Sequence, residues 1–284
     1  MEKEIVLITG ASSGFGYKTA LHLAKDGYLV IATMRDLHKK EALLDEARMQ
    51  NTLQNIVVLQ LDVTNKEDLN DVKNVINSTY GRLDVLINNA GYCLGGMTEY
   101  VEMIQWEQQL NTNVLGVVAT TKAFIPMMRK RRKGKIINIG SISGRFGFPG
   151  LGAYTTSKFA LSGFSESLRL ELAPFNVSVS LIEAGAFKTS IWDKSLEDVD
   201  YEYDQDYENY SQFITNKAKE SAKQAEDPSQ VIELIVKICR SKKPRFRYPI
   251  GKGVKRMIYL KTVLPWFFIE RILLNMLNKK RKQH

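Results

Sequence analysis

The first 27 residues limit what this chain can fold into more than any other stretch. Residues 4–9 form a short apolar run rich in β-branched residues, residues 10–16 form a turn with three glycines, and residues 17–27 have the composition of a helix. A strand, a glycine turn and a helix in this order can bind a nucleotide phosphate through backbone amides and the helix N-terminus. Three glycines also fit a simple tight turn, but a second apolar run at 28–33 follows at the distance that a nucleotide-binding unit requires.

Strand-like apolar runs alternate with helix-like segments through the first 185 residues. Residues 135–141, with the sequence KIINIGS, form a continuous run of the kind that a sheet buried on both faces requires. Alternating strands and helices favour a parallel sheet. We therefore predict an α/β fold, a doubly wound parallel sheet of Rossmann type with helices on both faces, in a single domain with a C-terminal extension.

A tyrosine and a lysine four residues apart carry the main chemical signal. Tyr154 and Lys158 begin an apolar-periodic segment that ends at Pro174, so a helix would bring both side chains to one face. A fixed cation beside a phenol lowers a pKa that is ordinarily about 10. The pair is therefore a candidate for proton transfer. A second match, Tyr248 with Lys252, contains a proline and a glycine and is not expected to be a helix.

Six motifs, in order and spacing, resemble the short-chain dehydrogenase/reductase family from residue 4 to about residue 190. They are Thr9-Gly10-x-x-x-Gly14-x-Gly16, Asp62 after a strand, Asn88-Asn89-Ala90-Gly91, Asn113 three residues before Gly116, Ser141, and Tyr154-x-x-x-Lys158. The chain looks most similar to bacterial members with a basic C-terminal extension, whose nearest animal relatives act on steroids and retinoids. The resemblance implies an oxidoreductase that acts on CH–OH or C=O groups.

The resemblance also implies roles for four side chains. Tyr154 is expected to be the general acid in reduction and the general base in oxidation, and Ser141 to steady the substrate oxygen. Lys158 is expected to bind the ribose hydroxyls and lower the pKa of the tyrosine. Asn113 is expected to hold a water that extends the proton relay to solvent. Structural alternatives are a turn after a strand for Ser141 and a helix-interior amide for Asn113.

The same resemblance implies which residues bind a nicotinamide dinucleotide, the source or acceptor of the hydride. The expected contacts are Gly10, Ser12, Ser13, Gly14, Phe15, Gly16, Arg35, Asp62, Val63, Asn89, Ala90, Gly91, Tyr154, Lys158, Gly185, Phe187 and Thr189. Asp62 fits a turn-initiating residue as well. Ala184 stands where the family usually has a proline, which puts the rigidity of the following loop in doubt.

The end of the second strand indicates which cofactor is bound. An acid about 20 residues past the glycines accepts from the ribose 2′-OH of NAD, whereas an arginine accommodates the 2′-phosphate of NADP. Met34 takes the place of the acid and Arg35 follows it. We therefore predict NADP(H), with NAD(H) as the alternative. Asp36 beside the arginine and the neutral Ser13 in the glycine turn weigh toward that alternative.

We divide the chain into a dinucleotide-binding and catalytic core (1–190), an acidic substrate lid implied by the resemblance (191–225), and a C-terminal helix, strand and basic amphipathic extension (226–284). Residues 197–210 hold seven acids, four tyrosines and no Lys or Arg, which also fits a disordered acidic loop. The side chains expected to line the substrate cleft are Cys93, Leu94, Phe148 and Trp192, together with the lid tyrosines. This apolar wall favours a small hydrophobic ketone, aldehyde or secondary alcohol.

The net charge of +9 is concentrated near the C-terminus. Residues 240–284 hold 14 Lys and Arg against one Glu, whereas the preceding 239 residues hold 26 against 30 acids. Because Trp266, Phe267 and Phe268 lie among these cations, part of the region must be buried against a partner. The candidates are the substrate cleft, a second subunit and, as a peripheral contact, an anionic membrane surface. No nucleic-acid recognition motif accompanies the charge, so no nucleic-acid partner is expected.

Two cysteines and three scattered histidines predict neither a disulfide framework nor a metal site. No leader precedes the strand that begins near Glu4, and no apolar run approaches the roughly 20 residues that span a bilayer. We therefore expect a cytoplasmic protein, assembled as a homodimer or homotetramer.

Two other functions compete with this interpretation. A nucleotide-sugar epimerase of the extended branch shares Tyr-x-x-x-Lys, but it would have glycines spaced as Gly-x-x-Gly-x-x-Gly and a larger C-terminal substrate domain, and the sequence has neither. A cofactor-binding regulatory or scaffold protein with little turnover would be expected to lose Ser141, Tyr154 or Lys158, and all three are present. The sequence favours the oxidoreductase and leaves its substrate and physiological direction open.

Overall fold

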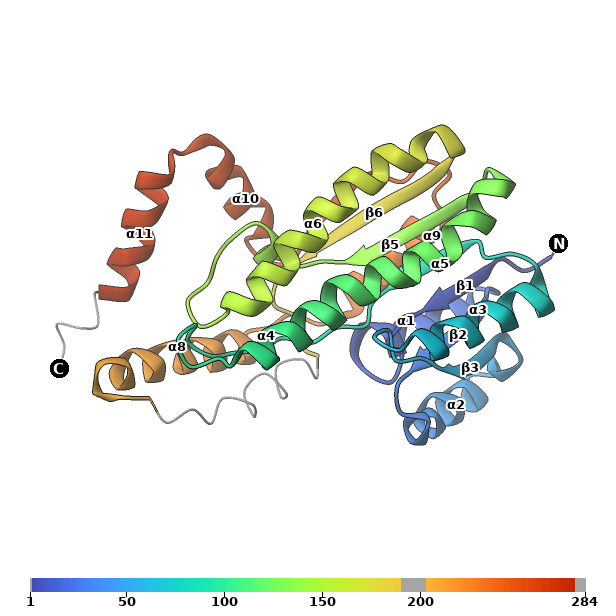
Figure 1. Cartoon of the computed structure of the whole chain (residues 1–284), viewed down its shortest axis with the longest axis horizontal. Coiled ribbons are helices and arrows are strands. Elements are labelled where there is room, and N and C mark those ends of the chain that lie inside the picture. Colours follow the sequence, from blue (N-terminus) through green and yellow to red (C-terminus); the bar gives the residue numbers. More distant parts are fainter. Residues whose placement is uncertain (1, 190–202, 279–284) are drawn as a thin grey trace.

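The computed structural model describes residues 2–189 and 203–278. Seven strands form one parallel sheet in the order β3-β2-β1-β4-β5-β6-β7. They are β1 (Ile5–Ile8), β2 (Leu29–Met34), β3 (Ile56–Gln60), β4 (Val85–Asn88), β5 (Gly134–Ile139), β6 (Val177–Ala184) and β7 (Arg247–Ile250). The strand order reverses between β1 and β4, so the predicted doubly wound sheet is confirmed (Figure 1).

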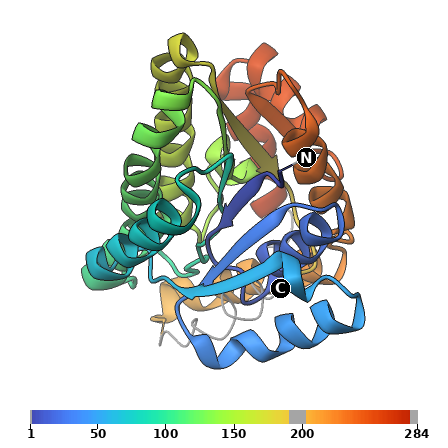
Figure 2. The same cartoon turned by 90° about the vertical axis from the view of Figure 1, so that its right-hand side faces the viewer.

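Helices cover both faces of this sheet (Figure 2). Side chains of α1, α2 and α9 form a core with one face, and those of α3, α5 and α6 form a core with the other. The helices are α1 (Gly14–Lys25), α2 (Lys40–Met49), α3 (Lys66–Tyr80), α4 (Met103–Leu110), α5 (Gly116–Arg131), α6 (Gly152–Leu172), α8 (Gln205–Lys223), α9 (Ser229–Arg240), α10 (Val254–Val263) and α11 (Trp266–Asn278).

Alternation along the strands explains why they are apolar throughout. In β1, Val6 and Ile8 face the core on the α1 side, whereas Ile5 and Leu7 face the core on the α5 side. All four side chains are buried. A strand covered on both faces has no solvent side on which a polar residue is preferred. This is why a run without alternation marked the sheet in the sequence.

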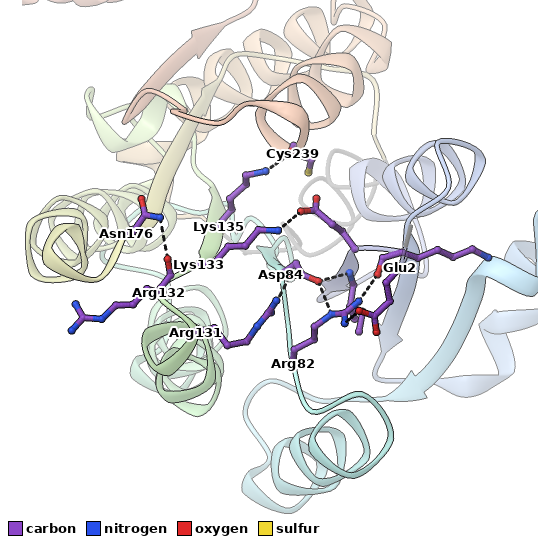
Figure 3. Close-up of polar contacts among 12 residues, drawn as sticks. Glu2, Arg82, Asp84, Arg131, Arg132, Lys133, Lys135, Asn176 and Cys239 are labelled. Carbon is purple, nitrogen blue, oxygen red and sulfur yellow. Dashed lines mark hydrogen bonds and ion pairs between the residues drawn. The ribbon is translucent and has the colours of Figure 1, made fainter.

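A buried carboxylate joins three elements at the amino-terminal edge of the sheet (Figure 3). Asp84 accepts hydrogen bonds from the backbone N–H of Ile5 (2.9 Å), from Arg131 Nη1 (2.9 Å) and from Arg82 Nε (3.3 Å). Burial raises the pKa of this carboxyl, but the hydrogen bonds and the two arginines outweigh burial and hold it below its ordinary value. The cluster fixes the strand starts at the edge opposite the glycine turn.

The C-terminal region completes the same sheet. β7 pairs with β6, and Tyr248, the tyrosine of the second Tyr-x-x-x-Lys match, lies in this strand as expected for a segment that is not a helix. Figure 1 shows α8 and the pair α10 and α11 at the end of the molecule toward which the strands point. None of the helices within the described ranges is long and apolar enough to cross a membrane.

Candidate active site

The glycine turn and the Asn-Asn-Ala-Gly motif meet where the strand order reverses. Thr9 Oγ1 accepts hydrogen bonds from the backbone N–H groups of Asn89 and Ala90, both at 3.0 Å. The Asn89 side chain donates to the carbonyls of Thr9 (3.0 Å) and Gly10 (2.7 Å). Neighbouring Asn88 donates to Asn138 Oδ1 (2.8 Å), joining β4 to β5. The motif therefore builds the scaffold of the crevice in which doubly wound folds bind their ligands.

Three glycines are required by the shape of this turn. Gly10 and Gly14 have positive φ angles of +68° and +60°. A Cβ at Gly10 would lie 2.8 Å from Ala90 Cα, and a Cβ at Gly16 would lie 2.4 Å from the Gly10 carbonyl oxygen. α1 starts within the turn at Gly14, and its backbone amides face the crevice end of the sheet. The turn fits the pyrophosphate of a dinucleotide, which Gly10, Ser12, Ser13, Gly14, Phe15 and Gly16 would surround.

The ends of β2 and β3 carry the residues expected beside the adenosine half. Arg35 is exposed directly after β2, where Met34 is fully buried. Asp36 pairs with Lys39 (3.8 Å) and accepts from the His38 backbone, and no ion pair joins it to Arg35 within the part of the chain that the structure describes. Asp36 therefore does not form an ion pair with Arg35 in the described structure, and the side chain of Arg35 is left exposed.

Asp62 behaves as the turn residue that the alternative interpretation described. Its Oδ1 accepts from the backbone N–H (2.9 Å) and the hydroxyl (2.7 Å) of Thr64. Val63 is buried, and a Cβ at Gly116 would lie 2.6 Å from its Cγ2. Both residues lie at the carboxyl end of β3, so the turn role of Asp62 and a place beside the adenine are compatible.

The segment after β6 returns to the glycine turn. The Phe187 and Phe15 rings meet edge to face at 5.9 Å, and a Cβ at Gly14 would lie 3.7 Å from Thr189. Gly185 donates its N–H to the Ile250 carbonyl (2.9 Å), so pairing with β7 orders the chain directly after Ala184. The structure thus brings Gly185, Phe187 and Thr189 to the cofactor side of the crevice. Trp192, expected next to the substrate, lies outside the described residues.

Ser141, Tyr154 and Lys158 converge on one small volume at the carboxyl edge of β5. Tyr154 and Lys158 project from the start of α6, and the Lys158 Nζ lies 5.6 Å from the centre of the Tyr154 ring. Lys158 donates to the Ile139 carbonyl at 3.0 Å. Ser141 caps the short helix η4 (Ile142–Gly144) and makes a side-chain hydrogen bond with Tyr154. Two hydroxyls joined in this way can both address one substrate oxygen.

Burial is the main influence on the pKa values of Tyr154 and Lys158. Burial is the main cause that raises the pKa of Tyr154 above its ordinary range, with a smaller rise from Cys93, and the hydrogen bond with Ser141 opposes both. Burial lowers the pKa of Lys158 to about 8. Burial is thus the main influence on Tyr154 in the chain without a cofactor. The lowering of the tyrosine pKa by Lys158 that the resemblance implies stays a prediction. A tyrosine that stays protonated at neutral pH can donate a proton.

Asn113 lies in a single turn of π-helix, η3 (Asn111–Leu115), between α4 and α5. Its Nδ2 donates to the Tyr92 carbonyl (2.9 Å) and to Ser157 Oγ (3.0 Å), and its Oδ1 accepts from the Tyr92 N–H (3.1 Å). Ser157 in turn donates to the Tyr154 carbonyl (2.7 Å). The extra residue of a π-turn changes the direction in which nearby side chains point, compared with a regular α-helix. Asn113 thereby ties the segment after Gly91 to the catalytic helix.

These features agree with a known family. The model of the short chain dehydrogenase family matches residues 4–200 of this chain. The chain is a short-chain dehydrogenase. It is 42% identical to the uncharacterized oxidoreductase YusZ of Bacillus subtilis, over 96% of this chain and 98% of that protein. It is 37% identical to human retinol dehydrogenase 8, over 91% of this chain and 85% of that protein. The resemblance to bacterial relatives and to retinoid enzymes is confirmed.

The fold of this short-chain dehydrogenase is also found among solved structures. A structure of ElxO with NADP bound superimposes with a TM-score of 0.75 at 28% identity, over 90% of this chain and all of that chain.

The residues expected to line the substrate cleft differ in their surroundings. Cys93 is buried near Tyr154 and Lys158, and burial raises the pKa of its thiol to about 12. Leu94 is packed in a small cluster with Val101 and Ala153, and its N–H donates to the buried Gln109 (2.8 Å). These contacts give Leu94 a structural role, and its place in the substrate cleft stays a prediction. Phe148 is half-buried beside Phe146, with ring centres 6.4 Å apart.

The described part of the segment expected to form a lid is helical and packs on the segment after β4. Asp204 caps α8 by accepting from the N–H groups of Asp206 and Tyr207. The Tyr203 and Tyr207 rings meet the Tyr100 ring edge to face at 4.8 and 5.4 Å. The acidic composition is thus compatible with a folded helix, because its tyrosines supply the packing. Residues 191–202 of the expected lid lie outside the described residues.

The sequence interpretation missed a buried ion cluster behind Ser141. Glu183 at the end of β6 pairs with Arg145 (2.6 Å) and with Arg247 of β7 (2.8 Å). Lys261 of α10 donates to the Arg145 carbonyl and lies 4.8 Å from the centre of the Phe146 ring. An acid inside an apolar strand was the available signal, since buried acids in proteins are paired. The cluster holds the loop that follows Ser141.

Proposed function

We propose that this protein is an NADP(H)-dependent oxidoreductase that transfers a hydride between the nicotinamide and a hydrophobic ketone, aldehyde or secondary alcohol. The observation that carries the proposal is the convergence of Ser141, Tyr154 and Lys158 beside a glycine turn that only glycines can form. When bound, the cofactor supplies or accepts the hydride at its nicotinamide ring.

The proton steps fall to the chain's own side chains. In reduction, the Tyr154 hydroxyl would donate its proton to the developing alkoxide, and in oxidation the phenolate would accept it. The Ser141 hydroxyl would donate a hydrogen bond to the same oxygen and stabilise its charge. Lys158, charged below its pKa of about 8, would bind the ribose hydroxyls. Asn113 would hold the start of α6 in place, and its expected relay water stays a prediction.

Three observations support NADP(H) over NAD(H). Arg35 is exposed at the end of β2, where the 2′-substituent of the adenosine ribose lies in doubly wound folds. Asp36 is held by Lys39 and the His38 backbone. ElxO, which superimposes on this chain, was solved with NADP bound. NAD(H) remains the alternative cofactor.

A hydrophobic substrate is supported by the apolar character of the side chains expected to line the cleft. Cys93, Phe148 and the lid tyrosines supply apolar and aromatic surface, and human retinol dehydrogenase 8 is named for an apolar alcohol. A cytoplasmic location and a homodimer or homotetramer stay predictions.

The test is turnover of a carbonyl panel with each cofactor. Purified protein at high concentration is mixed with NADPH or NADH and with steroid, retinoid, fatty and small aliphatic ketones or aldehydes, and product is measured by mass spectrometry. We expect product from the apolar carbonyls, and more with NADPH. No product from any carbonyl would contradict the proposal and favour the regulatory or scaffold protein.

A further inference from the structure

Exposed apolar side chains gather on the C-terminal helices. Fifteen large apolar side chains are exposed among the described residues, and more than half of them lie in one short stretch. They are Tyr259, Leu260, Val263, Trp266, Phe267, Phe268, Ile272 and Leu274. Single exposed apolar residues are normal on a protein surface, but a contiguous group of this kind marks an interaction surface.

These helices form a hairpin that stands away from the sheet (Figure 1). The hairpin is anchored by Val254, which is buried against the Gly185 turn, and by Lys261 on the loop after Ser141. In α11, Ile269 is buried, whereas Phe267 and Phe268 are 61% and 51% exposed. The apolar side chains on the inner side of the hairpin are thus buried against the protein, whereas aromatic rings on its outer side are exposed.

The charge of the outer surface selects the partner. Lys255, Arg256 and Arg271 are exposed among the apolar side chains, and Glu270 is the only acid in residues 240–284. The sequence continues directly after α11 with Lys279, Lys280, Arg281 and Lys282. A face that combines aromatic residues with cations suits the headgroup region of an anionic bilayer. A second copy of the same face would bring like charges together.

The length of the helices excludes insertion across a bilayer. At 1.5 Å per residue, the 13 residues of α11 extend about 20 Å, which is shorter than a hydrocarbon core of about 30 Å. We propose that the α10–α11 hairpin lies in the interface of an anionic membrane and holds the protein there. Because the hairpin lies at the end toward which the strands point, docking would bring the substrate entrance beside the bilayer.

Docking on the membrane adds a source of substrate to the proposed function. Only this delivery of substrate rests on the proposed function. An apolar carbonyl or alcohol partitions into lipid, so a crevice beside the bilayer would receive its substrate from the membrane phase. The docking itself follows from the hairpin alone and is measured without turnover. Failure of one proposal is therefore distinguishable from failure of the other.

The test is co-sedimentation of the full chain with vesicles of phosphatidylcholine alone or mixed with phosphatidylglycerol. We expect the wild type to bind the anionic vesicles, and added salt to weaken binding. The double variant Phe267→Ser and Phe268→Ser should lose at least about tenfold in partition coefficient, since burial of one such ring contributes on that order. The matched control, Met49→Ser with Leu170→Ser, removes two exposed apolar side chains elsewhere and should bind like the wild type.

Trp266 gives a second readout within the hairpin. In a variant with Trp106→Phe and Trp192→Phe, it is the only tryptophan left of three. We expect its emission to shift to shorter wavelength when anionic vesicles are added. The proposal would be overturned if the wild type stayed in the supernatant. It would also be overturned if the variant Phe267→Ser with Phe268→Ser bound vesicles as well as the wild type. A third contrary result would be that this serine variant differs from the wild type only in a smaller assembly mass by light scattering, because the exposed face would then join subunits.

Discussion

Lys158 shows that burial at the site has an energetic cost. Its ammonium is buried, and its pKa in the folded chain is about 8 against an ordinary 10.5. At about 1.4 kcal/mol per pKa unit, keeping it charged at neutral pH costs on the order of 3 kcal/mol. We expect Lys158→Met to increase the free energy of unfolding at about pH 7 by up to this amount, measured by urea unfolding, while turnover is lost.

The pH dependence of this gain follows from the direction of the shift. Between about pH 8 and 10.5 the unfolded chain still holds the proton that folded Lys158 has released, so wild-type stability rises with pH relative to the variant. The stability difference should therefore shrink between about pH 7 and pH 10. A difference that stays constant over this range would contradict the account of burial.

Arg35 is the residue on which the cofactor preference depends. Because it is exposed at the end of β2, its replacement removes a cation without opening the core. Arg35→Asp should weaken NADPH binding by at least about tenfold, the size of one charge-assisted contact, and leave NADH binding equal or tighter. Lys25→Asp is the control, since it makes the same change of charge at an exposed position at the far end of α1. Unchanged NADPH affinity in Arg35→Asp, measured by fluorescence titration, would sink the assignment.

Positions of the proposed catalytic side chains were predictable, whereas their protonation was not. The spacing of four residues placed Tyr154 and Lys158 on one helix face, and the family resemblance added Ser141. The raised pKa of Tyr154 depends on burial by segments distant in sequence, among them the one that carries Cys93. Similarly, the partners of Asn113 are backbone groups of Tyr92 and the hydroxyl of Ser157, which no local pattern indicates.

At the scale of elements, the ends of β6 and β7 support the loop after Ser141 through Glu183. This carboxylate receives Arg145 and Arg247, and η4 packs so closely on α6 that a Cβ at Gly144 would lie 2.8 Å from the Lys158 carbonyl oxygen. Loosening the loop should therefore misplace the Ser141 hydroxyl. Displacements of about an ångström at such sites lower rates by about a hundredfold.

We expect Glu183→Gln to lower kcat by about ten- to a hundredfold with little change in cofactor affinity, because the variant acts on Ser141 and not on the glycine turn. Glu166→Gln is the matched control, since Glu166 is exposed and contacts the same Arg247 at 2.5 Å. Equal kcat values for the two variants would show that the ion cluster does not position the serine. A raised KM without a change in kcat would do the same.

Elements differed in how far the sequence predicted them. Strands of the core were marked by apolar runs, because both faces of the sheet are covered. The π-turn at Asn111–Leu115 was not predicted, since α4 and α5 read as ordinary helix and the extra residue is stabilised by tertiary contacts of Asn113. The segment 197–210 was expected as a substrate lid or a disordered acidic loop, and in its described part Tyr203 and Tyr207 pack on Tyr100.

At the scale of the whole molecule, apolar residues on α4 and η3 indicate assembly. Met103, Ile104 and Leu115 are 71%, 54% and 57% exposed on the side of the sheet opposite α1 and α9. We expect a mass of at least two copies by light scattering, and a lower mass for Leu115→Lys. The variant Phe267→Ser with Phe268→Ser should keep the wild-type mass. A monomeric wild type would contradict the predicted homodimer or homotetramer.

The amino-terminal and carboxyl edges of the sheet have different roles. The Asp84 cluster fixes the strand starts, while the carboxyl edge carries the glycine turn, the catalytic trio and the C-terminal hairpin. The sequence indicated the whole of the parallel sheet and its cofactor crevice, because the motifs that mark them are short and local. It left open what covers the basic tail, since the answer depends on which side chains of α10 and α11 the fold leaves exposed.

The most direct test of the account is single-turnover oxidation of NADPH by Tyr154→Phe beside the wild type. Phenylalanine keeps the ring and its packing but removes the proton, so cofactor affinity should be unchanged. Product formation with a carbonyl that the wild type reduces should fall at least about a thousandfold, within the range attributed to general acid catalysis. Reduction by Tyr154→Phe within a few-fold of the wild type would contradict the central claim that this hydroxyl delivers the proton.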